Sequence, residues 1–272
     1  MTRLSTFIVH YSPLSERKKF LEENLPTQLD AVWVTEKDVA RSITVPMIKW
    51  TSSRDIFGLK KRVISVDLRT NIKSNVMSRR LAYIESQALS LLSYIPGFPS
   101  HYRYGGIPRW EKVPLPALEV TTMHYEAIRR SSISESSWTL VLEDDAVPNG
   151  DVVNRILEIT NKLNTNKPIW INLNSGVNLK RTKSDKFPDE LGLFRVKPPS
   201  TRCAVAYLTN RSYVDSAIQL FSKYPLPDWL GIDFIYQVVN RKIGAKSFWT
   251  EPVLFLQGSE TGLYKSNQPA PE

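Results

Sequence analysis

The sequence predicts an α/β protein in which helices flank a sheet, and three observations support this. Short apolar, β-favouring runs alternate with amphipathic helical patterns along most of the 272 residues. The chain opens as strand, turn, helix and strand with short connections. Its composition, 42% hydrophobic and 10% aromatic, is that of an ordinary globular protein. The length allows one large domain or two small ones; we take residues 1–266 as one domain and 267–272 as a flexible tail.

The first elements predict a parallel start to the sheet. Residues 5–11 are apolar enough for a central strand rather than an edge strand. Ser12 is a good N-cap residue and Pro13 suits the first helical position, and leucines spaced along one face follow them. Residues 31–34 read as the next strand. A strand–helix–strand unit with short linkers predicts parallel pairing through a right-handed crossover.

The segment that follows is harder to place. The pattern weakens after residue 35, although residues 63–68 suggest a strand and residues 74–94 a helix. Residues 96–116 are rich in proline, glycine and aromatic residues. A loop of this length inside a compact domain is usually functional or mobile. Its aromatic side chains suit stacking on a sugar or a base, and they would equally serve to cover the core.

The second half of the chain returns to regular alternation. The predicted helices are 118–131, 151–163, 210–224 and 234–243, and the predicted strands are 138–142, 169–174, 194–196, 203–208 and 252–256. Asn210 is the expected cap of its helix, and Gly244 closes the last one. Residues 257–266 form a segment able to fold over a ligand.

Charge is concentrated most densely where the strand 138–142 delivers Glu143, Asp144 and Asp145 into a loop. If the extended geometry persists, Glu143 and Asp145 share one side and Asp144 takes the other. Two such charges about 4 Å apart repel by roughly 1 kcal/mol in water and about 4 kcal/mol at the effective dielectric of a protein cleft. A divalent cation would relieve this repulsion. Mg²⁺ or Mn²⁺ held by one or two carboxylates completes its shell with phosphate oxygens and water, so the pattern favours a phosphate ester as the ligand.

A structural explanation of the same acids remains open. Asp144, Asp145 or Asn149 would also serve as the N-cap of the helix that begins near Asp151, where acidic residues complement the helix dipole. In that case the acidic run would have no ligand.

Other candidate residues lie at turns and on one helix. His124 either contacts a ligand or is a hydrogen-bonded structural histidine. Asp228 and Asp233 precede the helix at 234–243. Asp233 is either a helix cap or a general base, because a carboxylate within hydrogen-bond reach of an acceptor hydroxyl can take its proton.

The net charge of +9 is unevenly distributed. Residues 1–110 hold 17 Lys and Arg against 9 Asp and Glu, a net +8, whereas residues 111–272 hold 19 against 18, a net +1. A basic half beside an acidic loop suits an anionic ligand such as a nucleotide diphosphate, a phosphorylated glycan, a lipid headgroup or nucleic acid, although a solvated basic face explains the charge equally well. The dinucleotide-binding glycine fingerprint and the P-loop motif do not occur, so metal and basic side chains are the expected phosphate ligands.

The remaining composition bounds the environment. Cys203 is the single cysteine, which excludes an internal disulfide and a cysteine-based zinc site and favours a reducing compartment. The first residues do not read as a secretory signal, and no apolar run approaches the roughly 20 residues of a membrane span. We therefore expect a cytoplasmic protein, with peripheral membrane contact as one option.

The order of these features resembles glycosyltransferase family 25, which includes lipooligosaccharide and collagen galactosyltransferases. The most specific match is Val141-Leu142-Glu143-Asp144-Asp145-Ala146-Val147-Pro148, an apolar strand followed by the family's Glu-Asp-Asp motif. The opening residues 7–11 with Ser15-Glu16-Arg17 resemble the family's first strand and its Arg-bearing helix. Residues 117–130 take the place of its Ser-His helix, with Met123-His124 in place of Ser-His. Residues 228–233, Glu251-Pro252 and 257–259 resemble its C-terminal features, and residues 38–115 have no counterpart.

The resemblance implies a GT-A-like fold, a Rossmann-type mixed sheet whose acidic loop holds Mn²⁺ or Mg²⁺ against the diphosphate of a nucleotide sugar, with UDP as the expected nucleotide. Asp145 would be a metal ligand together with Glu143, and Glu143 and Asp144 would lie near the ribose or the metal. His10, Arg17 and His124 fall on the matching elements and are expected to contact the donor. No histidine follows the motif as a further ligand, so we expect either that the metal is bound more weakly or that Ser259 or Glu260 assists.

These observations give a hypothesis and two rivals. The chain is expected to be a metal-dependent glycosyltransferase that moves a hexose, with galactose as one candidate, from a nucleotide diphosphate sugar to a hydroxyl of a glycan or lipid-linked glycan. By the same resemblance transfer would invert the anomeric carbon, with Asp233 ahead of Asp228 as the base. One rival is a metal-dependent nuclease or phosphatase. The other is a noncatalytic nucleic-acid-binding protein, although nucleic acid is not the partner we expect.

Overall fold

The computed structural model describes residues 3–39, 115–163, 166–174, 189–196, 203–223 and 231–264. The expected strand at 63–68, the helix at 74–94 and the aromatic loop as far as residue 114 lie outside these ranges. So do Asp228 and the tail at 267–272.

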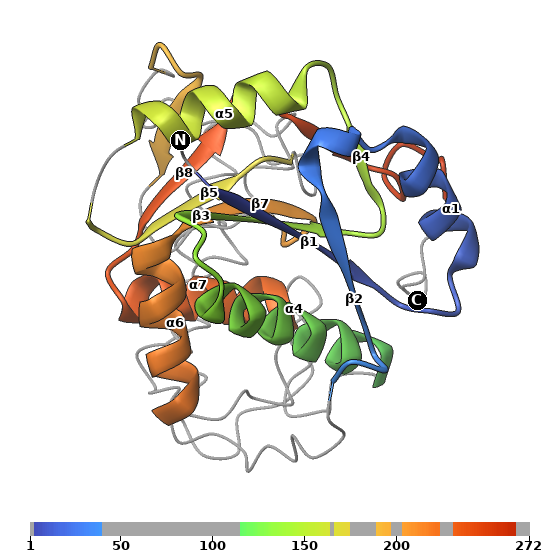
Figure 1. The fold of residues 1–272 in the computed structure, drawn as a ribbon, viewed down its shortest axis with the longest axis horizontal. Helices are drawn as coiled ribbons and strands as arrows, with labels where there is room; N and C mark the ends of the chain where they lie inside the picture. Colours follow the sequence, from blue (N-terminus) through green and yellow to red (C-terminus); the bar gives the residue numbers. More distant parts are fainter. Residues whose placement is uncertain are drawn as a thin grey trace, which may run out of the picture.

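A mixed, seven-stranded sheet forms the centre of the described structure, and it confirms the predicted α/β class (Figure 1). The strands lie in the order β2-β1-β3-β7-β5-β8-β6. They are β1 (Leu4–His10), β2 (Ala31–Thr35), β3 (Trp138–Glu143), β5 (Ile169–Asn172), β6 (Leu193–Val196), β7 (Ala206–Asn210) and β8 (Lys246–Thr250). β1 pairs in parallel with both β2 and β3, as a central strand does, whereas β7 runs antiparallel to its neighbours β3 and β5.

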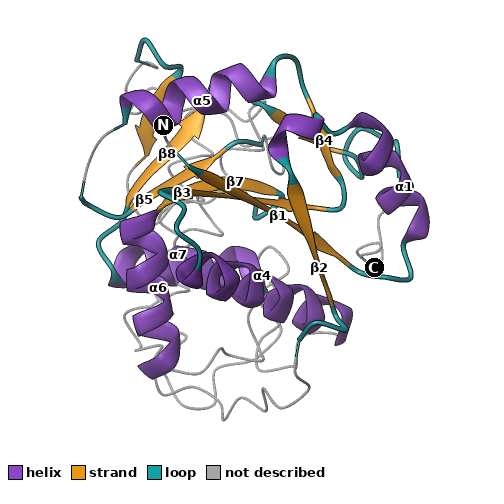
Figure 2. Cartoon of the chain, viewed as in Figure 1, coloured by secondary structure: helices purple, strands orange, loops and turns teal. Residues whose placement is uncertain are grey.

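Helices cover both faces of this sheet (Figure 2). One face carries α4 (Leu115–Ile133), α6 (Arg211–Lys223) and α7 (Ile232–Lys242). The other carries α1 (Ser15–Asn24), the short 3₁₀ helix η1 (Thr27–Leu29) and α5 (Val152–Lys162). A small second sheet pairs β4 (Ala146–Pro148) with β9 (Phe255–Gln257), which brings the C-terminal segment beside the acidic loop. None of the described helices is both long and apolar enough to span a bilayer.

The sheet separates two hydrophobic clusters, one on each face, because alternate strand residues point to opposite faces. In β1, Phe7 and Val9 pack in the cluster under α4, α6 and α7, whereas Ile8 packs in the cluster under α1 and α5. In β3, Val141 belongs to the first cluster and Leu142 to the second. Because successive strand residues point to opposite faces, residue 143 is directed toward α4 and residue 144 toward α1. This alternation separates the first two acids of the motif.

Several boundaries differ from those predicted. α1 begins at Ser15 and not at Ser12–Pro13, because residues 11–14 form a turn in which the Leu14 N–H donates to the Tyr11 carbonyl at 2.9 Å. The Ser12 N–H donates instead to the carboxylate of Glu36 at 3.0 Å.

The C-terminal strands also differ from the prediction. β7 begins at Ala206 and not at residue 203, and β9 at Phe255 and not at residue 252. β8 was not predicted, because its sequence Lys-Ser-Phe-Trp-Thr lacks an apolar run. It is instead held by pairing with β5 and β6 on both sides.

The topology marks one edge of the sheet. The chain leaves β1 through α1 to β2 on one side, and β3 lies on the other side of β1. β1, β3 and β5 run in the same direction, so His10, Glu143 and Asn172 end their strands at one edge. In open α/β sheets, ligands bind outside the carboxyl ends of the strands at such a switch point.

Candidate active site

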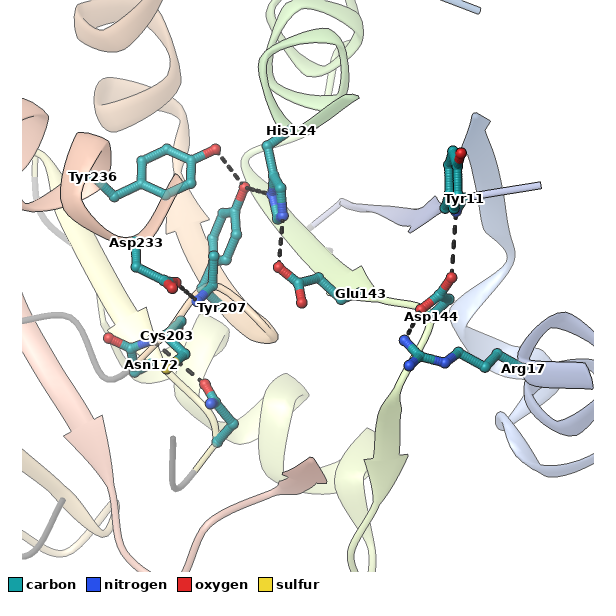
Figure 3. Close-up of polar contacts among 12 residues, drawn as sticks. Tyr11, Arg17, His124, Glu143, Asp144, Asn172, Cys203, Tyr207, Asp233 and Tyr236 are labelled. Atoms are coloured by element: carbon teal, nitrogen blue, oxygen red, sulfur yellow. Dashed lines mark hydrogen bonds and ion pairs between the residues drawn. The ribbon is translucent and has the colours of Figure 1, made fainter. Parts of the chain in front are cut away.

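The acidic motif lies at this edge, where β3 ends. Glu143 is the last residue of β3, and Asp144 and Asp145 form the turn into β4. Figure 3 shows Glu143 and Asp144 pointing in opposite directions, the former toward His124 on α4 and the latter toward Arg17 on α1. The predicted separation of these two acids onto opposite sides is therefore confirmed.

Asp144 is held by protein donors on both of its oxygens. Its Oδ1 accepts from the Arg17 guanidinium at 2.9 Å, and its Oδ2 lies 2.9 Å from His10 Nδ1 and accepts from the Tyr11 N–H at 3.3 Å. The Asp144 side chain is only 7% exposed. A buried carboxylate that is saturated in this way has little capacity left for a metal ion. Asp144 therefore fixes the turn to β1 and α1.

Glu143 has a different environment. Its Oε1 lies 3.0 Å from His124 Nε2, and the side chain remains 22% exposed. Among the described residues, no hydrogen bond reaches the second carboxylate oxygen. Burial of the carboxylate, followed by the charges of Asp145 and Asp144, raises the pKa of Glu143 well above its usual range. A bound cation would favour the ionised form of this group.

His124 is fully buried and uses both ring nitrogens. Its Nδ1 lies 3.1 Å from the Tyr207 hydroxyl, opposite the contact with Glu143. Burial lowers the pKa of His124 to about 3, so the ring is neutral at physiological pH. His124 is a hydrogen-bonded, buried histidine, and it also borders the candidate site, because the carboxylate that it contacts belongs to the acidic motif.

Asp145 differs from Asp144 although the two are adjacent. Its Oδ2 accepts from the Ser259 hydroxyl at 2.9 Å, while its Oδ1 is buried and has no hydrogen-bond partner among the described residues. The whole residue is only 4% exposed. Burial raises the pKa of Asp145, and Arg17 and the hydrogen bond from Ser259 oppose that rise. A buried carboxylate oxygen without a partner is costly, and a bound cation would satisfy it.

Asp233 lies in the first turn of α7, close to the same acids. Gly231 is the N-cap of this helix, so Asp233 is not the cap. Its Oδ1 accepts from the Ala204 N–H at 2.6 Å (Figure 3). Burial, and then the charge of Glu143, raises the pKa of Asp233 to about 6. A carboxylate with such a pKa is suited to general-base catalysis near neutral pH.

The Cys203 thiol indicates that the carboxylates face one region. Its pKa is raised well above the usual value, first by burial and then by the charges of Asp233, Glu143, Glu260 and Asp145. The backbone at Cys203 has a φ of 137°, a region that favours glycine. The thiol is therefore a poor nucleophile in strongly anionic surroundings.

The residues fit a divalent cation held by few protein ligands. Within the described ranges, no three His, Cys, Asp or Glu side chains come together as a ready metal cage. Asp144 is saturated, which leaves the unpartnered oxygen of Asp145 and the second oxygen of Glu143. Mg²⁺ and Mn²⁺ are commonly held by one or two carboxylates, with phosphate oxygens and water completing the shell. This donor set fits such an ion only together with a phosphate ligand.

The structure brings together most of the residues predicted for the site. Glu143, Asp144, Asp145, Asp233, His10, Arg17 and His124 all lie at or beside the acidic edge. His10 and His124 are buried and Arg17 nearly so, and each contacts a carboxylate. Their contact with a donor stays a prediction, as does any role of Asp228, which lies outside the described residues.

The capping explanation of the acidic run is wrong. Asp151 caps α5, accepting from the Asn154 N–H at 3.3 Å, while Asp144 and Asp145 are engaged elsewhere. Asn149 bonds instead to the segment before β9, its N–H donating to the Leu254 carbonyl.

Two participants were missed by the sequence reasoning. Tyr207 on β7 and Tyr236 on α7 extend the contact of His124 into the core, and their hydroxyl groups lie 2.6 Å apart. Each has apolar neighbours that favour a core position, Leu208 in β7 and Ile235 in α7, which gives no signal of a polar role. Ser259 was expected to assist the metal, and the structure places its hydroxyl on Asp145.

Comparisons with known proteins add no identification. No family model matches the chain, and no curated protein matches it significantly.

Proposed function

We propose that this protein is a metal-dependent glycosyltransferase that moves a hexose from a nucleotide diphosphate sugar to a hydroxyl of a glycan or glycoconjugate. The observation that carries the proposal is the unpartnered, buried oxygen of Asp145 beside Glu143, at the switch point of an α/β sheet. A cation would satisfy this oxygen, and because few protein ligands are present, phosphate oxygens and water would complete its shell.

Each residue has a distinct task in this proposal. Asp145 and Glu143 would hold Mn²⁺ or Mg²⁺, and Asp144 fixes the turn through His10 and Arg17. When bound, the cation neutralises the charge that develops on the departing diphosphate. The exposed part of Glu143 would face the donor.

Asp233 is the proposed base. With a pKa of about 6 it is largely ionised at neutral pH, and it remains basic enough to accept a proton from the acceptor hydroxyl. The Ala204 N–H holds one of its oxygens and so orients the carboxylate. An uncharged acceptor hydroxyl suits an already anionic site better than an anionic acceptor would.

A donor screen tests this proposal. Thermal stability of the whole chain is measured with UDP-, GDP- and CMP-linked sugars, each with and without Mn²⁺, and transfer is then assayed with the donor that stabilises. A donor at 100 times its dissociation constant stabilises by about 2.7 kcal/mol. We expect stabilisation by one nucleotide diphosphate sugar, only with metal, followed by sugar transfer to a glycan acceptor.

Matched variants give the screen its controls. Asp145→Asn is expected to lose the metal-dependent stabilisation, whereas Asp151→Asn retains it, because Asp151 is a helix cap whose function asparagine preserves. Hydrolysis of phosphodiesters without a response to nucleotide sugars would instead assign the site to a nuclease or phosphatase. Binding to nucleic acid that depends steeply on salt and is indifferent to metal would identify a noncatalytic nucleic-acid-binding protein.

A further inference from the structure

A line of hydrogen-bonding groups runs from the acidic motif into the core. Glu143 Oε1 lies 3.0 Å from His124 Nε2, His124 Nδ1 lies 3.1 Å from the Tyr207 hydroxyl, and the Tyr207 and Tyr236 hydroxyls are 2.6 Å apart (Figure 3). The four groups come from β3, α4, β7 and α7. Elements that are distant in the sequence therefore contribute to one series of hydrogen-bonding groups, and this series ends at one oxygen of Glu143.

The aromatic members of this line are held rigidly. His124, Tyr207 and Tyr236 are each fully buried. Trp170 stacks on the Tyr207 ring with centroids 4.0 Å apart and packs against the Tyr236 ring at 4.4 Å. Hydroxyl groups enclosed in this way have few alternative partners, so their bonds to one another are costly to lose.

The chemistry of the groups determines which of them donates and which accepts at each hydrogen bond along the line. When Glu143 is ionised, which is the form that a bound cation favours, its carboxylate only accepts hydrogen bonds, so the hydrogen of the neutral His124 ring belongs on Nε2, facing Glu143. Nδ1 is then an acceptor and requires the Tyr207 hydroxyl to donate to it. The Tyr207 oxygen in turn accepts from the Tyr236 hydroxyl. The two tyrosines thus favour the histidine tautomer that donates to Glu143.

We propose that Tyr207 and Tyr236 are positioning residues that act through His124. They select its Nε2–H tautomer, which holds one oxygen of Glu143 and leaves the other directed toward the cation. The expected change in metal affinity rests on the proposed metal-dependent function, whereas the hydrogen-bond geometry does not. Residues that hydrogen-bond to a metal ligand and orient it, without contacting the metal, typically lower metal affinity about 10- to 100-fold when they are removed.

Two paired variants test the proposal in the full-length protein. Tyr207→Phe removes the hydroxyl that donates to His124 and keeps the stacked ring. Tyr213→Phe is the matched control, since Tyr213 is equally buried and its hydroxyl donates to Asn240 at 2.7 Å, with no connection to Glu143. We expect Mn²⁺ affinity, measured by titration with the metal and UDP, to fall about tenfold in Tyr207→Phe and to remain unchanged in Tyr213→Phe. Tyr236→Phe should lower it by a smaller factor.

A second readout is independent of metal binding and of activity. Nitrogen-15 NMR of the histidine rings in the metal-free wild type, recorded at a pH high enough to ionise Glu143, reports which nitrogen of His124 carries hydrogen. The Nε2–H tautomer with an accepting Nδ1 is expected, and an Nδ1–H tautomer overturns the proposal. Equal Mn²⁺ affinity of Tyr207→Phe and the wild type overturns it as well. If the wild type binds no Mn²⁺, the proposed function fails, whereas the NMR result still decides the direction of the line.

Discussion

Asp144 and Asp145 are neighbours in sequence and both are almost fully buried, yet the fold treats them in opposite ways. Asp144 receives donors on both oxygens from β1 and α1. Asp145 receives a hydroxyl on one oxygen, and its other oxygen has no partner among the described residues. The saturated acid contributes to the stability of the fold. The unsaturated acid reduces stability and is therefore the better candidate for a ligand-binding role.

The largest expected effect is that of removing the Asp144 carboxylate, which accepts hydrogen bonds on both oxygens. Asp144→Ala removes the carboxylate that the Arg17 guanidinium and the buried His10 ring contact. Removing one member of a buried ion pair typically costs about 3–5 kcal/mol. Urea unfolding of the wild type and the variant measures this loss.

The neighbouring acid supplies the control for that measurement. Asp145→Asn is expected to raise the free energy of unfolding at neutral pH, because burial raises the pKa of Asp145 and its ionised form is unfavourable without a ligand. If both variants lose stability equally, the distinction between the two acids is wrong.

The next effect concerns Asp233 and pH. Its pKa rises from an ordinary 3.8 to about 6 on folding. The folded state therefore binds a proton more tightly, and the contribution of this group to stability is present below pH 3.8 and lost as the pH rises through about 6. A shift of this size corresponds to about 3 kcal/mol at neutral pH. Unfolding at pH 4.5 and 7 should show a decline in the wild type that is reduced in Asp233→Asn.

Catalysis should show the opposite pH trend for the same residue. A general base must be ionised, so kcat/KM for sugar transfer should rise to a plateau above about pH 6. Asp233→Asn should lower kcat by about 100-fold or more. A variant with wild-type kcat would remove Asp233 from the mechanism, and the assignment of the base would pass to another residue.

The smallest expected effect is that of removing the Ser259 hydroxyl, which lies in the C-terminal segment and donates to Asp145. Ser259→Ala removes a hydroxyl donor to Asp145 and should reduce stability by about 1 kcal/mol. Ser222→Ala serves as the control, because the Ser222 hydroxyl donates to the Gln219 carbonyl on the exposed surface of α6. Thermal unfolding of both variants distinguishes a specific effect from the loss of any hydroxyl. A larger loss in Ser222→Ala would contradict the assigned role.

Local patterns explain which parts of this structure the sequence predicts well. The apolar run of β1 carries enough information to place it as a central strand, that of β3 predicts a strand, and the two-residue period sends Glu143 and Asp144 to opposite faces. The acidic edge follows, because parallel strands end together. His124 and Glu143 were both selected as candidates, although the contact between them and the contact of His124 with Tyr207 were not predicted.

The missed features depend on long-range contacts. Tyr207 and Tyr236 meet His124 only after β7, α7 and α4 have packed, and no spacing in the chain encodes that meeting. β8 is defined by its neighbours in the sheet more than by its own residues. α1 begins later than predicted because residues 11–14 form a turn, and the Ser12 N–H within that turn donates to the carboxylate of Glu36, 24 residues along the chain.

The most direct test of the central claim is electron-nuclear double resonance on Mn²⁺ added to the protein with UDP. If Asp145 and Glu143 hold a cation against a diphosphate, the bound Mn²⁺ should show strong coupling to phosphorus in the wild type and in Asp151→Asn. In Asp145→Asn this protein-bound signal should disappear. Retention of the same signal by Asp145→Asn, or bound Mn²⁺ without phosphorus coupling in the wild type, would contradict the account.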